Sequence, residues 1–120
     1  MKVVASAVLS IVLHLTLGWA WTAGAGMVAG FWVMRRGALV GALAVGMGWA
    51  ALVAWNFAAA PQQVAEMSRV VGSLMGGLPP IAATLATIVL GMLLGGSGGA
   101  VGAQAARILE RAANTAATTP

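Results

Sequence analysis

The stretch GALVGALAVGMGWAALVAWNF, residues Gly37–Phe57, decides the fold of this chain. It carries no charged residue. As a helix rising about 1.5 Å per residue it is about 30 Å long, which matches the hydrocarbon core of a bilayer. An apolar stretch of this length is typical of a helix that crosses a membrane. We therefore predict a membrane-spanning helix here.

Small residues recur along this stretch at alternating steps of four and three, beginning with Gly37 and Gly41. The last apolar segment shows the same alternation from Gly91 onward, and the second segment has Gly26 and Gly30. Apolar side chains gain little by leaving lipid, so close approach of backbones drives helix association in a membrane. The predicted helix-packing residues are Gly26, Gly30, Gly37, Gly41, Ala44, Gly48, Gly91, Gly95, Gly98 and Gly102. Several such seams in a small chain favour spare seams for partners.

The composition of the whole chain indicates the same environment. Of its 120 residues, 61% are hydrophobic and only 7% are charged, whereas a soluble domain carries about a quarter charged residues. The mean hydropathy is +0.97, and a chain this short has too little interior to bury so much apolar surface. The absence of cysteine excludes disulfides, thiolate metal sites and a cysteine nucleophile.

Two shorter apolar runs precede the central stretch, and a longer one follows it. The two short runs measure only about 24 Å each as helices, so we predict that they form a hairpin turning near Gly18. One long glycine-bent helix is an alternative, and a cleaved signal peptide is another. The predicted spans are residues 3–18, 19–34, 37–57 and 80–106. The predicted fold is therefore an all-α integral membrane protein, with four transmembrane helices in two hairpins.

Residues 61–75, between the last two spans, have a different character. Apolar residues recur there at steps of three and four, while Glu66 and Arg69 lie on the opposite side, which is typical of an amphipathic helix. We predict that this helix lies flat in the membrane interface; a connecting helix packed on the protein is the alternative. These elements make one domain over residues 1–113, and residues 114–120 are expected to form a flexible tail.

Basic and aromatic residues flank the predicted spans and set their orientation. Four crossings put five of the six basic residues on one side and only Arg69 on the other, so both termini are expected in the cytoplasm. Tryptophan favours membrane boundaries because its ring is apolar and its N–H needs a partner. The predicted interface anchors are Trp19, Trp21, Trp32, Trp55, Arg35 and Arg36. The expected location is a bacterial inner membrane.

Few side chains in this sequence can do chemistry. Glu66 and Glu110 are the only carboxylate side chains, and both lie outside the predicted spans. Paired acids, a Ser/His/Asp set and a metal cluster are therefore missing, and we predict that the protein is not an enzyme. In size and expected helix count the chain is similar to the small multidrug transporters, but it lacks the carboxylate in the first helix on which they depend. The basic residues form no run, so no nucleic-acid partner is expected.

His14 is the only histidine and lies within the first apolar run. Ser10 and His14 share one helical face, which directs the imidazole toward other helices. We predict an interhelical hydrogen bond; the alternatives are a proton shuttle and an axial ligand for haem or a chlorophyll-type magnesium. The fragment Ser10-x-x-x-His14 followed by Trp21 is similar in outline to light-harvesting helices, and that resemblance implies the pigment ligand. Asn56, near the expected outer boundary, is the other polar group of interest.

These observations favour a non-enzymatic role in a membrane. They predict an accessory or assembly subunit, packed by its glycine and alanine seams in a larger membrane complex. A homo-oligomeric pore or small transporter is the alternative, and a pigment- or haem-binding subunit using His14 is the third. The expected partners are the lipid bilayer and other membrane subunits or copies of the chain. No cofactor or metal is expected outside the His14 alternative.

Overall fold

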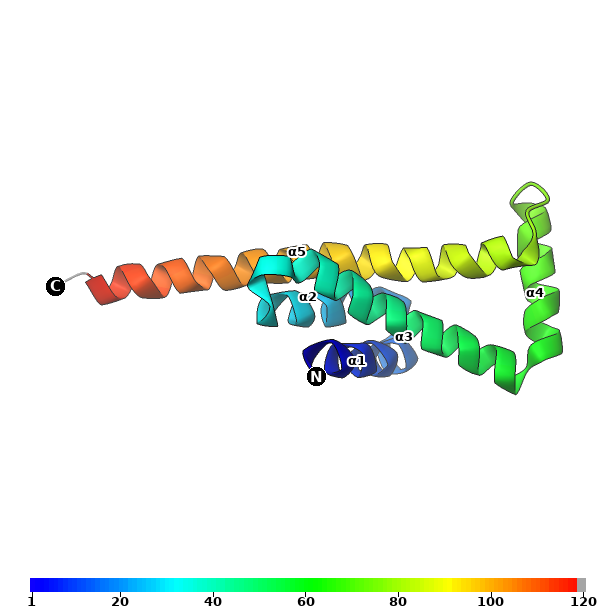
Figure 1. The fold of residues 1–120 in the computed structure, drawn as a ribbon, viewed down its shortest axis with the longest axis horizontal. Coiled ribbons are helices and arrows are strands. Elements are labelled where there is room, and N and C mark those ends of the chain that lie inside the picture. The colour runs from blue at the N-terminus through cyan, green and yellow to red at the C-terminus, as the bar shows by residue number, and fades with distance from the viewer. Residues whose placement is uncertain (119–120) are drawn as a thin grey trace.

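The computed structural model describes residues 1–118, and this part of the chain is helical almost throughout, with no strand. The predicted all-α class is therefore confirmed. The elements are α1 (Lys2–Leu17), the 3-10 turn η1 (Trp19–Trp21), α2 (Thr22–Trp32), the 3-10 turn η2 (Met34–Arg36), α3 (Gly37–Ala59), α4 (Pro61–Leu74) and α5 (Pro80–Thr118). Figure 1 shows α5 along the long axis of the molecule, α3 crossing it obliquely, and α4 standing across one end.

Two helical segments of the described chain are long and apolar enough to cross a membrane, Met34–Ala59 and Pro80–Ala117. α1 has 16 residues and α2 has 11. They are therefore about 24 Å and about 16 Å long, short of a bilayer core of about 30 Å. The prediction of four full crossings is not confirmed. The second predicted span is shorter than expected because the turns η1 and η2 take residues from both of its ends.

The first two helices form a hairpin that turns at a glycine. Gly18 has a φ of +96°, a left-handed value that residues with a Cβ rarely adopt. In the turn that follows, the Thr22 hydroxyl donates to the Trp19 carbonyl at 2.6 Å. At the open end of the hairpin, the Lys2 ammonium donates to the Trp32 carbonyl at 3.3 Å. The two helices therefore lie antiparallel, and the alternative of one long bent helix is wrong.

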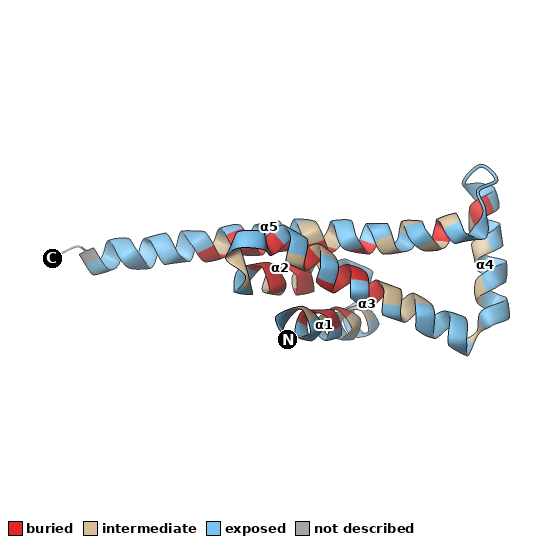
Figure 2. Cartoon of the chain, in the orientation of Figure 1, coloured by how far each residue is buried: buried red, intermediate tan, exposed pale blue. Residues whose placement is uncertain are grey.

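α5 is the central helix because it packs against both α2 and α3. Its glycines Gly95 and Gly99 meet Gly26 and Gly30 of α2 in the same order, so α2 and α5 run parallel. The same pair meets α3 in the reverse order, so α3 and α5 run antiparallel. A small core lies beside these contacts and consists of Ala25, Val45 and Trp49, with Leu9, Leu13 and Leu94 packed on it. Figure 2 shows the buried residues gathered where these helices meet.

α4 connects α3 to α5 and corresponds to the amphipathic helix expected over residues 61–75. Pro61 occupies its first turn, where the missing N–H removes no helical hydrogen bond. The chain returns through Gly76 and Gly77, whose φ values are +90° and +82°. α3 and α5 diverge toward α4, which spans the space between their ends (Figure 1).

α5 is longer than predicted. It has 39 residues, or about 58 Å, and it continues to Thr118 through residues expected to form a flexible tail. The reason is local, because Ala112, Ala113, Ala116 and Ala117 dominate this segment and alanine has the highest helix propensity. The last two residues of the expected tail lie outside the described part of the chain.

Candidate functional site

A seam of glycines holds α2, α3 and α5 in backbone contact. A Cβ added at Gly30 would lie 2.6 Å from the Gly99 Cα, and one added at Gly37 would lie 2.6 Å from the Ala103 Cβ. Real Cβ atoms essentially never come this close to another atom. A side chain at either position would therefore move a backbone and lose the many small dispersion contacts that hold the helices together.

The structure places every predicted packing glycine against another helix. An added Cβ would lie within 3.2 Å of an atom on another helix at Gly26, Gly30, Gly37, Gly41, Gly48, Gly91, Gly95, Gly98 and Gly102. Ala44 is fully buried. Sequence reasoning missed Gly99, which contacts Gly37. A signal was present, because Gly99 extends the row of Gly91 and Gly95 by another step of four.

These close contacts are all made within one chain. The predicted glycines face other helices of the same molecule, and α5 packs by glycines against both α2 and α3. The expectation that some seams serve partners stays a prediction. Because the three helices touch through their backbones, they leave no channel between them at this level.

Polar side chains of α1 are buried inside the helical bundle. Ser6 and Ser10 are fully buried, and neither hydroxyl has a hydrogen-bond partner in the described chain. The same is true of His14 Nδ1 and Trp49 Nε1. The two rings meet edge to face, with centroids 5.4 Å apart and planes at 78°. The predicted interhelical hydrogen bond is therefore missing at Nδ1, because the imidazole packs against an indole rather than facing an acceptor.

The pigment alternative for His14 finds little space on this face. A Cβ added at Gly48 would lie 3.2 Å from Ser10 Oγ and 3.2 Å from the Ala7 carbonyl oxygen, so α1 and α3 touch one turn away from the imidazole. A haem or chlorophyll on this face of His14 would have to part the two helices. No group of three or more His, Cys, Asp or Glu residues comes together within the described part of the chain.

Basic residues gather at one end of the helical bundle formed by α1, α2, α3 and the middle of α5. This end carries Lys2, Arg35, Arg36 and Arg107. The Arg107 guanidinium donates to the Met34 carbonyl at 2.9 Å, which ties α5 to the turn η2. Arg69 lies at the other end, on α4, where it pairs with Glu66 at 3.4 Å and both side chains are exposed. The lengths of α3 and α5 therefore separate a basic end from an end with a single basic residue.

The tryptophans divide into an exposed set and one buried residue. The exposed set consists of the predicted anchors Trp19, Trp21, Trp32 and Trp55. Trp19 and Trp21 form the tip of the α1–α2 hairpin, and Trp32 lies at the basic end. Trp49 is only 8% exposed, because its ring packs over Gly91 and against His14. It belongs to the core and not to a membrane boundary.

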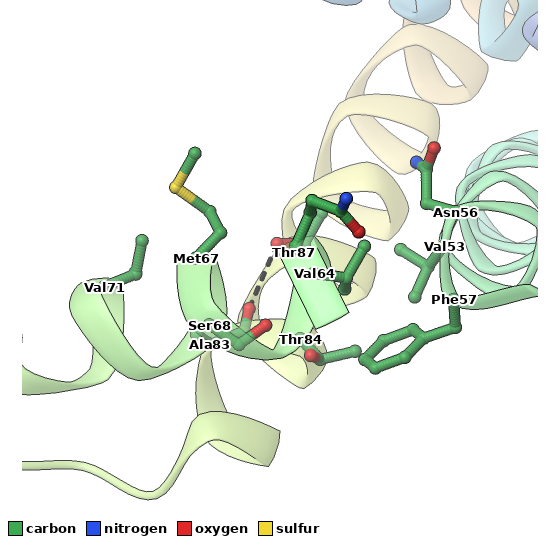
Figure 3. Close-up of a pocket in the computed structure, with 11 residues that line it drawn as sticks. Val53, Asn56, Phe57, Val64, Met67, Ser68, Val71, Ala83, Thr84 and Thr87 are labelled. Atoms are coloured by element: carbon green, nitrogen blue, oxygen red, sulfur yellow. Dashed lines mark hydrogen bonds between the residues drawn. The ribbon is translucent and has the colours of Figure 1, made fainter. Parts of the chain in front are cut away.

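A half-open cavity of about 380 Å³ lies where α3, α4 and α5 diverge. In Figure 3, Val53 and Phe57 point from α3 toward Val64 of α4 and Thr84 of α5. The cavity walls are mainly apolar, and no charged side chain lines them. Asn56, the polar group noted in the sequence, lies in the wall. The cavity itself carried no sequence signal, because it depends on the angle between α3 and α5.

The end of α5 extends beyond the other helices as an arm, residues 107–117. Ala106 is the last buried residue, and every residue of the arm is exposed (Figure 2). At helical spacing, Ile108 and Leu109 share one face with the alanines that follow. The opposite face carries Arg107, Glu110 and Arg111. The arm is therefore an amphipathic helix whose apolar face is uncovered.

In comparisons with known proteins, no family model matches the chain, and neither a curated protein nor a solved structure matches it significantly.

Proposed function

We propose that this protein is a small, non-enzymatic integral membrane protein that joins a larger membrane complex as an accessory subunit, through the arm of α5. In this proposal α3 and α5 cross the bilayer, and the α1–α2 hairpin inserts beside them from the cytoplasmic side. The hairpin is about 24 Å deep, so its Trp19–Trp21 tip approaches the opposite boundary of a core about 30 Å thick.

The surface of the helices supports insertion. Large apolar side chains are exposed along the three longer helices of the bundle, including Val4, Val8, Leu15, Leu39, Leu43, Leu85, Val89 and Leu93. Soluble proteins rarely expose contiguous apolar patches larger than a few hundred Å². The basic end supports the orientation, because Lys and Arg are retained on the cytoplasmic side of a bacterial inner membrane. Lys2 lies beside Trp32 at this end, and α5 extends past it toward the C-terminus (Figure 1).

The observation that carries the subunit proposal is the uncovered apolar face of the arm. Ile108 and Leu109 are 64% and 59% exposed, and helices in proteins gain most of their stability by packing such a face. The arm continues the axis of α5 past the basic end (Figure 1), so it points away from the bilayer. A groove on a partner protein therefore suits it better than lipid, with side chains at helical spacing as anchors.

The glycine seam suits the same role. Because α5 packs by its backbone against α2 and α3, the bundle holds the direction of the helix from which the arm extends. A partner bound to the arm is then held at a defined orientation to the membrane-embedded bundle. A positioning subunit of this kind needs a rigid core and one binding face.

The experiment is a comparison of two arm variants purified from the native membrane. Leu109→Asn places an amide on the apolar face, and Arg111→Asn places the same amide on the polar face. Burial of one leucine side chain contributes about 1.5–3 kcal/mol, so Leu109→Asn is expected to lower recovery of the co-purifying subunit about tenfold or more. Arg111→Asn is expected to leave recovery within about twofold, since an exposed charge contributes less than about 1 kcal/mol. Equal recovery with both variants would refute the proposed role of the arm.

A further inference from the structure

We propose that the cavity between α3, α4 and α5 binds one acyl chain of a membrane phospholipid, with the ester carbonyl of that chain held by polar side chains at its rim. This inference rests on the membrane insertion proposed above, but it does not depend on any protein partner of the arm.

The walls of the cavity fit a hydrocarbon chain. Val53 and Phe57 of α3 point toward Val64 of α4, and Ala83 of α5 lines the same cavity. The volume of about 380 Å³ falls within the range of about 300–1,000 Å³ that is usual for ligand sites. The cavity is open on one side, so a chain can enter it sideways from the surrounding lipid.

The polar side chains at the cavity can donate to an ester carbonyl. Asn56, Gln63 and Ser68 make no side-chain hydrogen bond to another residue in the described part of the chain, so their N–H and O–H groups remain available. Thr84 and Thr87 already donate to backbone carbonyls of their own helix, at 3.5 and 3.0 Å. A carbonyl oxygen accepts hydrogen bonds only, and the two amides and one hydroxyl supply donors for it.

The lining also predicts which part of the lipid is recognised. No charged side chain lines the cavity, and the nearby Glu66 and Arg69 pair with each other on the exposed side of α4. A phosphate or ammonium group that entered the cavity would therefore lose its contact with water without gaining an opposite charge. The site takes the uncharged ester and chain, and leaves the head group in water.

The place of the cavity in the fold agrees with this ligand. α4 lies at the end opposite the basic cluster, where Met67 and Leu74 are 66% and 81% exposed. An amphipathic helix with such a face lies at the boundary between head groups and chains. The cavity directly beneath α4 is then at the depth of the esters and the first part of the acyl chains.

The test is photolabelling in vesicles of palmitoyl-oleoyl phosphatidylcholine doped with phosphatidylcholine that carries a diazirine on one chain. Labels are expected on the cavity residues Val53, Val64 and Thr84. Val53→Trp fills the cavity and is expected to lower labelling of α4 about tenfold, while the matched Val89→Trp, on an exposed face of α5, leaves it unchanged. Asn56→Leu keeps the size of the side chain but removes the donor, and about fivefold weaker labelling is expected from the loss of one hydrogen bond.

Three outcomes would overturn the inference. One is labelling of the cavity no stronger than labelling around Val89. Another is equal labelling in wild type, Val53→Trp and Asn56→Leu. The third is a result in which phosphatidylglycerol competes with the photolabel more than about tenfold better than phosphatidylcholine does. The site would then recognise a charged head group. Alkaline carbonate extraction separates the two proposals: protein released from the vesicles refutes insertion as well, whereas retained but unlabelled protein refutes only the lipid site.

Discussion

Two parts of α5 are helical for opposite reasons. From Gly91 to Gly102 the helix is rich in glycine, which disfavours helix by about 1 kcal/mol per residue, and it is held by α2 and α3. From Arg107 onward it is rich in alanine and exposed, so its own propensity forms it. Where a neighbouring backbone is close, a small side chain matters more than propensity. Where no neighbour covers the helix, propensity decides.

The largest effect is expected from Gly95→Leu, which sets the two rules against each other. Leucine favours helix by nearly 1 kcal/mol over glycine, but a Cβ here would lie 2.6 Å from the Val45 Cβ. Overpacking a tight contact costs up to about 3 kcal/mol and occasionally more. We expect loss of at least about 3 kcal/mol of stability, measured by unfolding in detergent. The control is Leu93→Ala, at an exposed position of the same helix, which should unfold like wild type. If both variants are equally stable, the small size of Gly95 does not matter for helix packing, and the glycine spacing only reflects the glycine-rich composition.

The second-largest effect is expected in the arm of α5, residues 107–117, and is confined to it. Ala112→Pro should break the helix there, since proline disfavours a helix interior by about 3 kcal/mol, and helical circular dichroism should fall. Because the arm lies outside the packed bundle, the unfolding midpoint of the bundle should stay within experimental error. A bundle that melts earlier in this variant would show that the arm stabilises the core, and the contrast drawn above would fail.

A third prediction separates the two parts of α5 by their surroundings. The natural chain has no cysteine, so Ser97→Cys and Ala116→Cys each introduce a single thiol at an exposed position of the same helix. In proteoliposomes a water-soluble maleimide should label the cysteine at 116 more than about tenfold faster, because the thiolate that reacts needs water. Similar rates at both positions would place the middle of α5 in water and refute membrane insertion.

The smallest effect is expected at His14, whose contact does not involve the seam between α2, α3 and α5. An edge-to-face aromatic pair contributes about 0.5–1.5 kcal/mol, so His14→Gln should lose about 1 kcal/mol and His14→Phe should lose less. Unfolding in detergent measures both. A visible absorption band in the wild type that disappears in His14→Phe would instead identify His14 as a pigment or haem ligand.

Sequence reasoning was most successful where spacing alone decides the contact. The alternation through Gly37, Gly41 and Ala44 requires only that the segment be a helix, so the packing face could be read directly. The length of α2 could not, because Trp19–Trp21 at one end of the predicted span and Val33 and Met34 at the other are apolar but lie outside the α-helix. The hydropathy of a segment indicates whether it favours lipid or water, but it does not show at which residue a helix ends.

The remaining features depend on how the helices are placed. The buried Trp49 could not be told from its boundary neighbours by residue type, since the His14 and Gly91 contacts come from other helices. The cavity beneath α4 arises from the angle at which α3 leaves α5, and no single segment encodes that angle. The expected tail began at Asn114, but α5 continues to Thr118, because the alanines of this segment favour helix.

The central position of α5 has a consequence for the order of synthesis. Gly99 is made long after Gly30 and Gly37, the residues it packs against. At about 5–20 residues per second, the first three helices wait several seconds for the helix that joins them. During that time α1, α2 and α3 have only one another to pack against, and Ala25, Val45 and Trp49 of the core all precede α5. A chain stopped before α5 is made would therefore keep part of its core but lack the backbone contacts that Gly95 and Gly99 supply.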